Sequence, residues 1–326
     1  MPKLRTTRAR LLTGLAVLAM AGASIHTTNA GATTGTSVAR PIVASVAAAS
    51  TTYEVESRAE VFVDPTRPTM RNGTYPGSPS RTLSTLIVSP KRQHRFERFP
   101  LIVFSHGFTA NGPSYALLLE QFAAAGYVVA APTFPLSSGG APGGPNLADY
   151  LNQPGDVSFV ITQMLRLNRR VGSPYYGLIR AHRIGVAGHS LGAITTLGVA
   201  YNSCCQDRRI DAAVPMSGIQ LPFGTGVYHE GRAVPLLLIH GTADGTVPYA
   251  GSSQAFAAAQ PPKYLVSLTG AGHVPFFGVH GPVVVESTIA FFDRYLKHRP
   301  GSLIRLLIAA HVPGVSTIIA GLPRFS

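Results

Sequence analysis

The sequence is poor in cysteine and tryptophan, and the scarcity of cysteine excludes whole classes of protein. Its 326 residues include no tryptophan and two cysteines, which are adjacent at Cys204 and Cys205. A scaffold held by many disulfides is therefore excluded. No histidine or carboxylate stands beside the pair at zinc-ligand spacing, so a zinc site is not expected either. In an exported protein the pair forms either a vicinal disulfide or no disulfide.

Negative charge and lysine are also scarce. There are 14 acidic against 27 basic residues, a formal net charge of +13, and arginine supplies most of the positive charge. The arginines are scattered and no nucleic-acid-binding motif accompanies them, so we expect no nucleic-acid partner and only a weak association with anionic surfaces. The hydrophobic content of 45% and the lack of a fixed-period repeat indicate a globular protein with a large core.

Long apolar runs are absent except near the N-terminus. Residues 11–23 form a short apolar run behind a basic head, and small residues follow at 21–23 and 28–30. This layout is typical of a secretory signal peptide, and the run is short for a membrane span. We therefore predict a signal peptide at 1–30, a disordered linker at 31–50 and a secreted protein, with a retained N-terminal anchor as the alternative.

Apolar runs alternate with helical periodicity along the remaining chain. The predicted strands are 52–63, 82–88, 101–104, 127–131, 183–187, 212–216, 235–239 and 264–268, and the predicted helices are 114–125, 156–168, 191–202, 251–259 and 283–296. Fully apolar strands separated by helices predict an α/β domain at 51–300, with a mostly parallel sheet covered by helices on both faces. The first strand is expected at the sheet edge, and Asp156 is expected to N-cap its helix. The apolar tail 301–326 is expected to pack on this domain, and the protein to be a monomer.

One short segment carries the strongest chemical signal. Residues 183–203 read "RIGVAGHSLGAITTLGVAYNS", in which Gly188-His189-Ser190-Leu191-Gly192 separates a strand from a helix. This context is that of a nucleophile elbow, where a serine at a strained strand-to-helix turn projects its hydroxyl above the sheet. We therefore predict that Ser190 is a nucleophile and that the backbone N–H of Leu191 stabilises an oxyanion.

A serine nucleophile needs a base, and eleven histidines compete for that role. His273 is favoured because it lies in "LTGAGHVPFF", just after the strand 264–268, where a loop can present it over the sheet edge. His280 is the alternative base, and His240 is expected to be held within its own turn. The predicted general base is His273.

The base must in turn be oriented by an acid. Asp244 in "LLLIHGTADGTVP" occupies the loop after a strand, and the chain order Ser190, Asp244, His273 is that of an α/β-hydrolase triad. Asp211 and Glu230 are weaker alternatives. The predicted acid is Asp244.

A second oxyanion donor is expected in "VFSHGFTANG", which follows the strand 101–104. The backbone N–H of Phe108 is predicted to complete the hole with Leu191, while His106 packs under the loop.

These motifs also carry a family resemblance. The segments "VFSHGF", "GDVSFVITQML", "GHSLG", "HGTADGTVP" and "GAGHVPF" resemble the α/β-hydrolase superfamily over residues 80 to 297. More narrowly, the sequence is similar to secreted bacterial esterases grouped with platelet-activating-factor acetylhydrolase, chlorophyllase and dienelactone hydrolase. The resemblance implies an α/β-hydrolase fold and hydrolase activity. Dienelactone hydrolases use cysteine, so Ser190 argues against that reaction, and polyester hydrolases are related at a similar distance.

The sequence says less about the substrate than about the fold. Residues 218–232 are too short for a helical cap, so an open site is expected, and its predicted lining is Phe108, Phe134, Leu221, Phe223 and Val274. We predict a serine hydrolase for short- to medium-chain esters or accessible polyesters, requiring no metal or cofactor. The alternatives are a lipase with residues 133–155 as its lid, an acyltransferase or a peptidase. A binding protein on an inactive scaffold is disfavoured because all three triad members are present.

Overall fold

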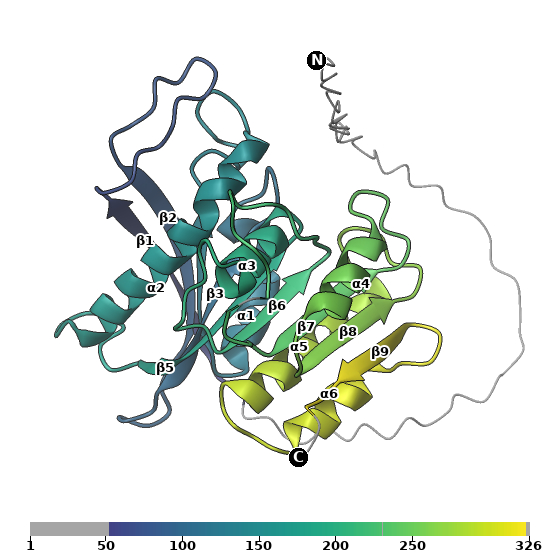
Figure 1. The fold of residues 1–326 in the computed structure, drawn as a ribbon. Coiled ribbons are helices and arrows are strands. Elements are labelled where there is room, and N and C mark those ends of the chain that lie inside the picture. The colour runs from purple at the N-terminus through teal and green to yellow at the C-terminus, as the bar shows by residue number, and fades with distance from the viewer. Residues whose placement is uncertain (1–51, 230, 324–326) are drawn as a thin grey trace, which may run out of the picture. The chain divides into compact units, whose positions relative to one another are not determined.

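A nine-stranded sheet forms the centre of the protein in the computed structural model, which describes residues 52–229 and 231–323 (Figure 1). The predicted signal peptide and linker, 1–30 and 31–50, lie outside the described residues. The strand order is β1-β2-β4-β3-β5-β6-β7-β8-β9. The strands are β1 (Val55–Asp64), β2 (Arg81–Pro90), β3 (Phe99–Ser105), β4 (Val128–Thr133), β5 (Ile179–His189), β6 (Ala212–Met216), β7 (Leu236–Gly241), β8 (Lys263–Leu268) and β9 (Ser316–Gly321).

Six central strands are parallel and the outer ones are not. β4, β3, β5, β6, β7 and β8 pair in parallel, whereas β2 and β1 at one edge and β9 at the other are antiparallel to their neighbours. The predicted edge position of the first strand is confirmed. Carboxyl ends of parallel strands meet at one edge of a sheet, which is where α/β folds place their sites.

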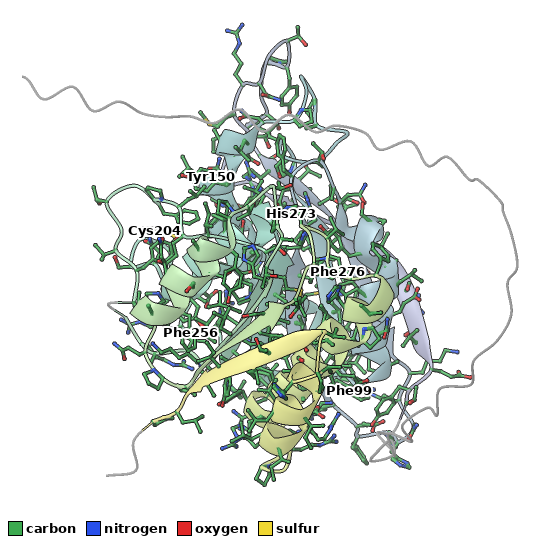
Figure 2. All side chains as sticks on the ribbon, turned by 90° about the vertical axis from the view of Figure 1, so that its right-hand side faces the viewer. Phe99, Tyr150, Cys204, Phe256, His273 and Phe276 are labelled. Atoms are coloured by element: carbon green, nitrogen blue, oxygen red, sulfur yellow. A yellow bond between two sulfur atoms is a disulfide. The ribbon has the colours of Figure 1, made fainter. Side chains whose placement is uncertain are left out.

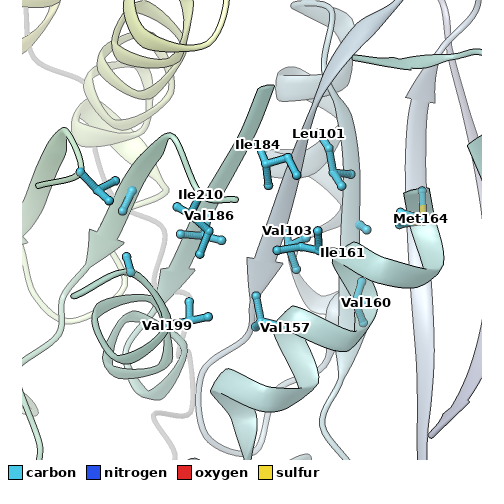
Figure 3. Close-up of a cluster of buried hydrophobic side chains, with 14 of the residues drawn as sticks. Leu101, Val103, Val157, Val160, Ile161, Met164, Ile184, Val186, Val199 and Ile210 are labelled. Carbon is cyan, nitrogen blue, oxygen red and sulfur yellow. The ribbon is translucent and has the colours of Figure 1, made fainter. Parts of the chain in front are cut away.

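Helices cover both faces, as fully apolar strands require. The helices are α1 (Ala116–Ala124), α2 (Gln153–Arg169), α3 (Leu191–Tyr201), α4 (Tyr249–Ala258), α5 (Gly281–Tyr295) and α6 (Ser302–Ala310). One core layer lies between the sheet and α2, α3 and α4, and the other lies between the sheet and α1, α5 and α6. In the first layer Val157, Ile161 and Met164 of α2 face Leu101 and Val103 of β3 (Figure 3). The predicted α/β-hydrolase fold is confirmed.

Asp156 does not N-cap α2, so that prediction is wrong. The helix begins three residues earlier at Gln153, which places Asp156 inside its first turn. Its carboxylate is fully buried and accepts hydrogen bonds from Arg81 Nε at 2.8 Å and Arg81 Nη2 at 2.6 Å. Arg81 also binds Asp149 through two hydrogen bonds. The aspartate therefore joins the helix to β2 rather than capping it.

The C-terminal residues contribute to the sheet itself. α6 packs on α5, and β9 pairs with β8 from Lys263↔Gly321 to Leu268↔Ser316. The sequence predicts that the apolar tail 301–326 packs on the domain, but it does not predict an edge strand there. Within the described ranges, no helix has the length and apolar character needed to cross a membrane.

Candidate active site

The strand-to-helix turn at Ser190 has the conformation of a nucleophile elbow. Ser190 has a positive φ of 57°, between the end of β5 and the first residue of α3. A Cβ on Gly188 would overlap the carbonyl oxygen of Gly192, and a Cβ on Gly192 would overlap the carbonyl oxygen of Ser105. Only glycine permits this close approach of strand and helix. The close packing of α3 against β5 and Ser105 holds Ser190 in this strained backbone conformation.

Ser190, His273 and Asp244 form a continuous hydrogen-bonded chain. The Ser190 hydroxyl lies 2.8 Å from His273 Nε2, and His273 Nδ1 lies 2.8 Å from Asp244 Oδ2. With Nδ1 protonated, it donates to the carboxylate and leaves Nε2 free to accept the serine proton. Ser190 follows β5, Asp244 follows β7 and His273 follows β8, so three strand ends bring the residues together.

The Asp244 carboxylate is held by four hydrogen bonds. Oδ1 accepts from the backbone N–H groups of Thr246 at 2.8 Å and Val247 at 2.9 Å, while Oδ2 accepts from His273 and from His240 Nε2 at 3.1 Å. Burial opposes ionisation, but the bonds from His273, Val247 and Thr246 outweigh it and lower the pKa of Asp244 below its ordinary value. The Asp244 carboxylate is therefore charged in the folded protein at neutral pH.

His240 is fully buried behind this carboxylate. Its Nε2 also lies 3.0 Å from the carbonyl oxygen of Val247, and its Nδ1 lies 2.7 Å from the Ser252 hydroxyl. Burial lowers its pKa, so the ring is neutral and donates through Nε2. His240 was expected to be held within its turn, and its contact with Asp244 was not foreseen.

Two backbone N–H groups lie beside the serine. Leu191 is the first residue of α3, and Phe108 follows Gly107, where an added Cβ would come within 3.3 Å of Ser190 Cβ. Between residues 52 and 323, leaving out 230, neither N–H has a hydrogen-bond acceptor. Both groups are thus available to a negatively charged oxygen near Ser190.

His189 and Tyr115 connect the two loops of the site, and sequence reasoning missed both. The Gly107 N–H donates to the Tyr115 hydroxyl at 3.1 Å, which in turn lies 2.8 Å from His189 Nδ1. His189 Nε2 lies 2.7 Å from the backbone carbonyl oxygen of His273, to which it donates. Burial lowers the pKa of His189 to about 4, so the ring is neutral and fulfils both roles. No local signal identifies this network, because Tyr115 and His189 are 74 positions apart.

His106 supports the loop that carries Phe108. It is fully buried, its Nδ1 lies 2.7 Å from the carbonyl oxygen of Gly107, and its Nε2 accepts from the Phe134 N–H at 2.9 Å. Burial lowers its pKa to about 4. The ring therefore holds the loop from below, as expected.

Two of the five predicted lining residues are buried in the core. Phe134 is 0% exposed and its ring contacts the His106 ring in a tilted arrangement at 4.9 Å between centroids, so it belongs to the core. Phe223 is 2% exposed and packs against Leu191 with Ile194. Their assignment to the open lining is wrong, because both rings fill space beneath the site.

The remaining predicted lining residues do reach solvent. Phe108 and Leu221 are half-buried and pack at the edge of the same small apolar cluster as Phe223. Val274, next to His273, is 53% exposed. These three side chains are accessible to a substrate.

An apolar groove lies on the other side of the His189–Tyr115 network. It has a volume of about 360 Å³, and its lining includes Tyr115, Leu117, Phe276 and Phe277. Leu117 is 73% and Phe277 71% exposed. The Phe276 ring contacts the His189 ring at 4.9 Å between centroids. Only His189 therefore separates this accessible apolar groove from His273 of the triad.

Residues 133–155 are anchored to the body of the protein at three points. Asn72 Nδ2 donates to the carbonyl oxygens of Pro142 at 2.7 Å and Gly144 at 2.6 Å. Arg81 of β2 binds Asp149. Within the segment, Gln153 Nε2 donates to the Ser137 hydroxyl at 2.8 Å. The Thr195 hydroxyl donates to Gln153. Displacing this segment would break buried ion pairs and hydrogen bonds.

The alternative triad members lie elsewhere. Asp211 precedes β6, at the opposite end of the sheet from Ser190, and accepts from the Ile184 N–H at 3.1 Å. His280 Nε2 lies 3.0 Å from the carbonyl oxygen of Thr269. Glu230 lies outside the described residues.

Cys204 and Cys205 form a vicinal disulfide. In the part of the chain described here, no group of three or more His, Cys, Asp or Glu residues is arranged to hold a metal ion.

Comparison with known proteins identifies the family. A comparison with curated proteins gives no match. A family model described as chlorophyllase matches residues 60–224, which include the second half of β1, all of β2 to β6 and the elbow at Ser190. The match agrees with the resemblance seen in the sequence. The chain belongs to the chlorophyllase family of the α/β-hydrolase superfamily and is a hydrolase of that type.

Proposed function

We propose that the protein is a secreted serine hydrolase that cleaves carboxylic esters through an acyl-enzyme on Ser190. The observation that carries the proposal is the chain from Ser190 Oγ through His273 to Asp244, beside the two available N–H groups of Phe108 and Leu191. These are the parts that acyl transfer requires, namely a nucleophile, a base, an orienting acid and oxyanion donors.

In the acylation step, Ser190 Oγ attacks the ester carbonyl carbon while His273 Nε2 takes the hydroxyl proton. The carbonyl oxygen becomes an oxyanion and accepts hydrogen bonds from the N–H groups of Phe108 and Leu191. The tetrahedral intermediate then expels the alcohol, which receives the proton from His273 Nε2. Asp244 keeps the proton of His273 on Nδ1 and stabilises the imidazolium.

In the deacylation step, water replaces the alcohol and the same groups act again. His273 Nε2 takes a proton from the water, whose oxygen attacks the acyl carbon. Collapse of the second oxyanion releases the carboxylic acid, and the proton returns to Ser190 Oγ. One ester and one water give one acid and one alcohol.

Short- to medium-chain esters are the proposed substrates. The described residues of the segment 218–232 form no helical cap. Phe108 and Val274 are partly exposed beside the serine, which therefore remains accessible to soluble molecules. The anchored segment 133–155 provides no lid that opens at a lipid interface, which argues against the lipase alternative.

A fluorophosphonate probe followed by peptide mass spectrometry tests the nucleophile. We expect labelling of Ser190 in the wild-type protein, and loss of both labelling and ester hydrolysis in Ser190→Ala. Ser253→Ala, which alters an exposed serine of α4, serves as the matched control and should retain both. Labelling of another residue, or undiminished hydrolysis by Ser190→Ala, would refute the proposal.

Secretion has its own test. Expression of the full chain in a bacterial host, followed by N-terminal sequencing of the exported protein, should show a new N-terminus within the first 31 residues. An intact N-terminus on a protein retained in the cytoplasm would contradict it.

A further inference from the structure

A group of exposed arginines lies at the end of the sheet opposite the triad. Arg92, Arg95 and Arg98 lie in the loop between β2 and β3, Arg169 ends α2, and Arg180 is the second residue of β5. We call these five residues the arginine patch. Arg92, Arg95, Arg98 and Arg169 line one open depression of about 710 Å³, and Arg98 and Arg180 line an adjoining small cavity.

The charge of the arginine patch is not neutralised within the domain. Over residues 52–229 and 231–323, none of its five members forms an ion pair with a carboxylate. Arg92 donates to the backbone carbonyl oxygens of Glu97 and Tyr176, and Arg180 donates to that of Arg98. The Glu97 carboxylate lies nearby but is bound by the Tyr53 hydroxyl and the Gln93 N–H. The patch therefore presents concentrated positive charge to an external anion.

Strongly exposed apolar side chains project from the same surface. Phe96 is 83% exposed and Val171 is 79% exposed, the two highest values among the large hydrophobic residues of the described chain. Phe96 lines the depression with Arg95, whose guanidinium carbon lies 5.4 Å from its ring centroid. Val171 lies two residues after Arg169, in the turn that follows α2. Exposed apolar side chains among cations are typical of surfaces that enter a lipid interface.

The N-terminal part of the chain joins the domain at this end. The Tyr53 N–H donates to the carbonyl oxygen of Ala124 at 2.9 Å, and Tyr53 lines the small cavity with Arg98 and Arg180. The first described residues of the chain therefore lie beside the arginine patch.

From these observations we infer that the arginine patch, with Phe96 and Val171, binds the surface of an anionic phospholipid bilayer. The arginines meet the phosphate groups, and the two apolar side chains enter the boundary between headgroups and acyl chains. An aromatic ring can stack on a nucleic-acid base, but an exposed valine gains nothing from such a polyanion. The two apolar residues together therefore favour lipid.

This orientation turns the catalytic site away from the bilayer. Arg180 and Ser190 are ten positions apart along β5, a separation of roughly 30 Å at the rise of a strand. In Figure 2, Phe99, which lines the small cavity with Arg98 and Arg180, lies low in the view and His273 lies above it. The bound protein would take its substrate from the aqueous side.

Vesicle flotation with the full chain tests the inference. We expect binding to vesicles of phosphatidylcholine containing phosphatidylglycerol, weaker binding at high salt, and little binding to pure phosphatidylcholine. At about 1 kcal/mol for each arginine near the surface, Arg95→Gln with Arg169→Gln should weaken binding about 30-fold. Phe96→Ser should also weaken it. Thermal unfolding of each variant shows whether it is folded without relying on ester hydrolysis.

The matched control is Arg71→Gln with Arg208→Gln. It removes the same charge from two exposed arginines that lie outside the patch and have no side-chain hydrogen bond among the described residues. Its binding should stay within roughly twofold of the wild type. Equal weakening by the control, or no binding to anionic vesicles at low salt, would overturn the inference. So would tight binding to DNA combined with vesicle binding that Phe96→Ser leaves unchanged.

Discussion

Acid should destabilise this protein through two histidines beneath the active site. His106 accepts the Phe134 N–H through Nε2, and His189 accepts the Tyr115 hydroxyl proton through Nδ1. Protonation would turn His106 Nε2 into a donor that faces the Phe134 N–H, and it would require the Tyr115 hydroxyl to give up its hydrogen bond to His189. Burial is the main reason that the pKa of each ring falls to about 4 in the folded protein.

The size and sign of the effect follow from the difference between folded and unfolded states. In the unfolded chain a histidine has a pKa of about 6.5, so between about pH 6.5 and pH 4 the unfolded state binds more protons. The free energy of unfolding therefore falls as the pH is lowered through this window and changes no further through these groups below it. At about pH 5 each ring should cost about 2 kcal/mol, or about 4 kcal/mol together.

Urea denaturation of the wild type, His106→Gln and His189→Gln at about pH 8 and about pH 5 measures this cost. Each substitution should reduce the difference in unfolding free energy between the two pH values by about 2 kcal/mol, whatever its effect at pH 8. His94→Gln, at an exposed histidine, should leave the difference unchanged. If both buried-site variants keep the full pH dependence of the wild type, the two rings are not the source of the acid sensitivity.

Four further outcomes are expected. Asp244→Asn should lower kcat for a soluble ester by about 10,000-fold, because His273 loses its correct tautomer. Asp211→Asn should leave kcat unchanged. If Asp211→Asn is the more damaging substitution, Asp211 and not Asp244 is the acid of the triad. Gly192→Ala should lower the free energy of unfolding by at least about 2 kcal/mol in urea denaturation, because the new Cβ overlaps the carbonyl oxygen of Ser105. A variant as stable as the wild type would show that β3 and α3 can move apart. Arg81→Met should cost about 3–5 kcal/mol, because it removes the buried cation shared by Asp149 and Asp156 and leaves Asp156 paired with Arg67 alone. A neutral result would argue against the importance of that ion cluster. Hydrolysis should fall with long acyl chains and should not accelerate above the solubility limit of the ester, whereas strong interfacial activation would identify residues 133–155 as a lid.

The parts of the site that were predictable depend on neighbours in sequence. Gly188 and Gly192 flank Ser190 within one pentapeptide, so the local pattern is sufficient to indicate the turn and its strain. Asp244 and His273 follow strands whose apolar runs are visible, and parallel strands bring such loops together. The order of elements and the position of each loop were therefore accessible from the sequence.

The errors concern contacts between distant segments. Asp156 has the pattern of an N-cap, but its partner Arg81 lies 75 positions earlier, and no local rule predicts that pair. Phe134 and Phe223 follow strands near the site, where periodicity alone cannot distinguish a ring that lines a cleft from one that fills the core beneath it. The role of His189 depends in the same way on Tyr115, from a different segment of the chain.

The position of β9 has a consequence for the order in which the domain can be assembled. β9 pairs along the whole of β8, yet it follows every other element in chain order. During synthesis β8 must therefore remain an open edge, with unpaired backbone groups, until all of the preceding elements have been made. His273 lies in the loop directly after β8, so the edge that supports the proposed base is the last to be closed. A version of the protein truncated before Ser316 would keep every proposed catalytic residue and still expose a strand that can pair with another copy of itself.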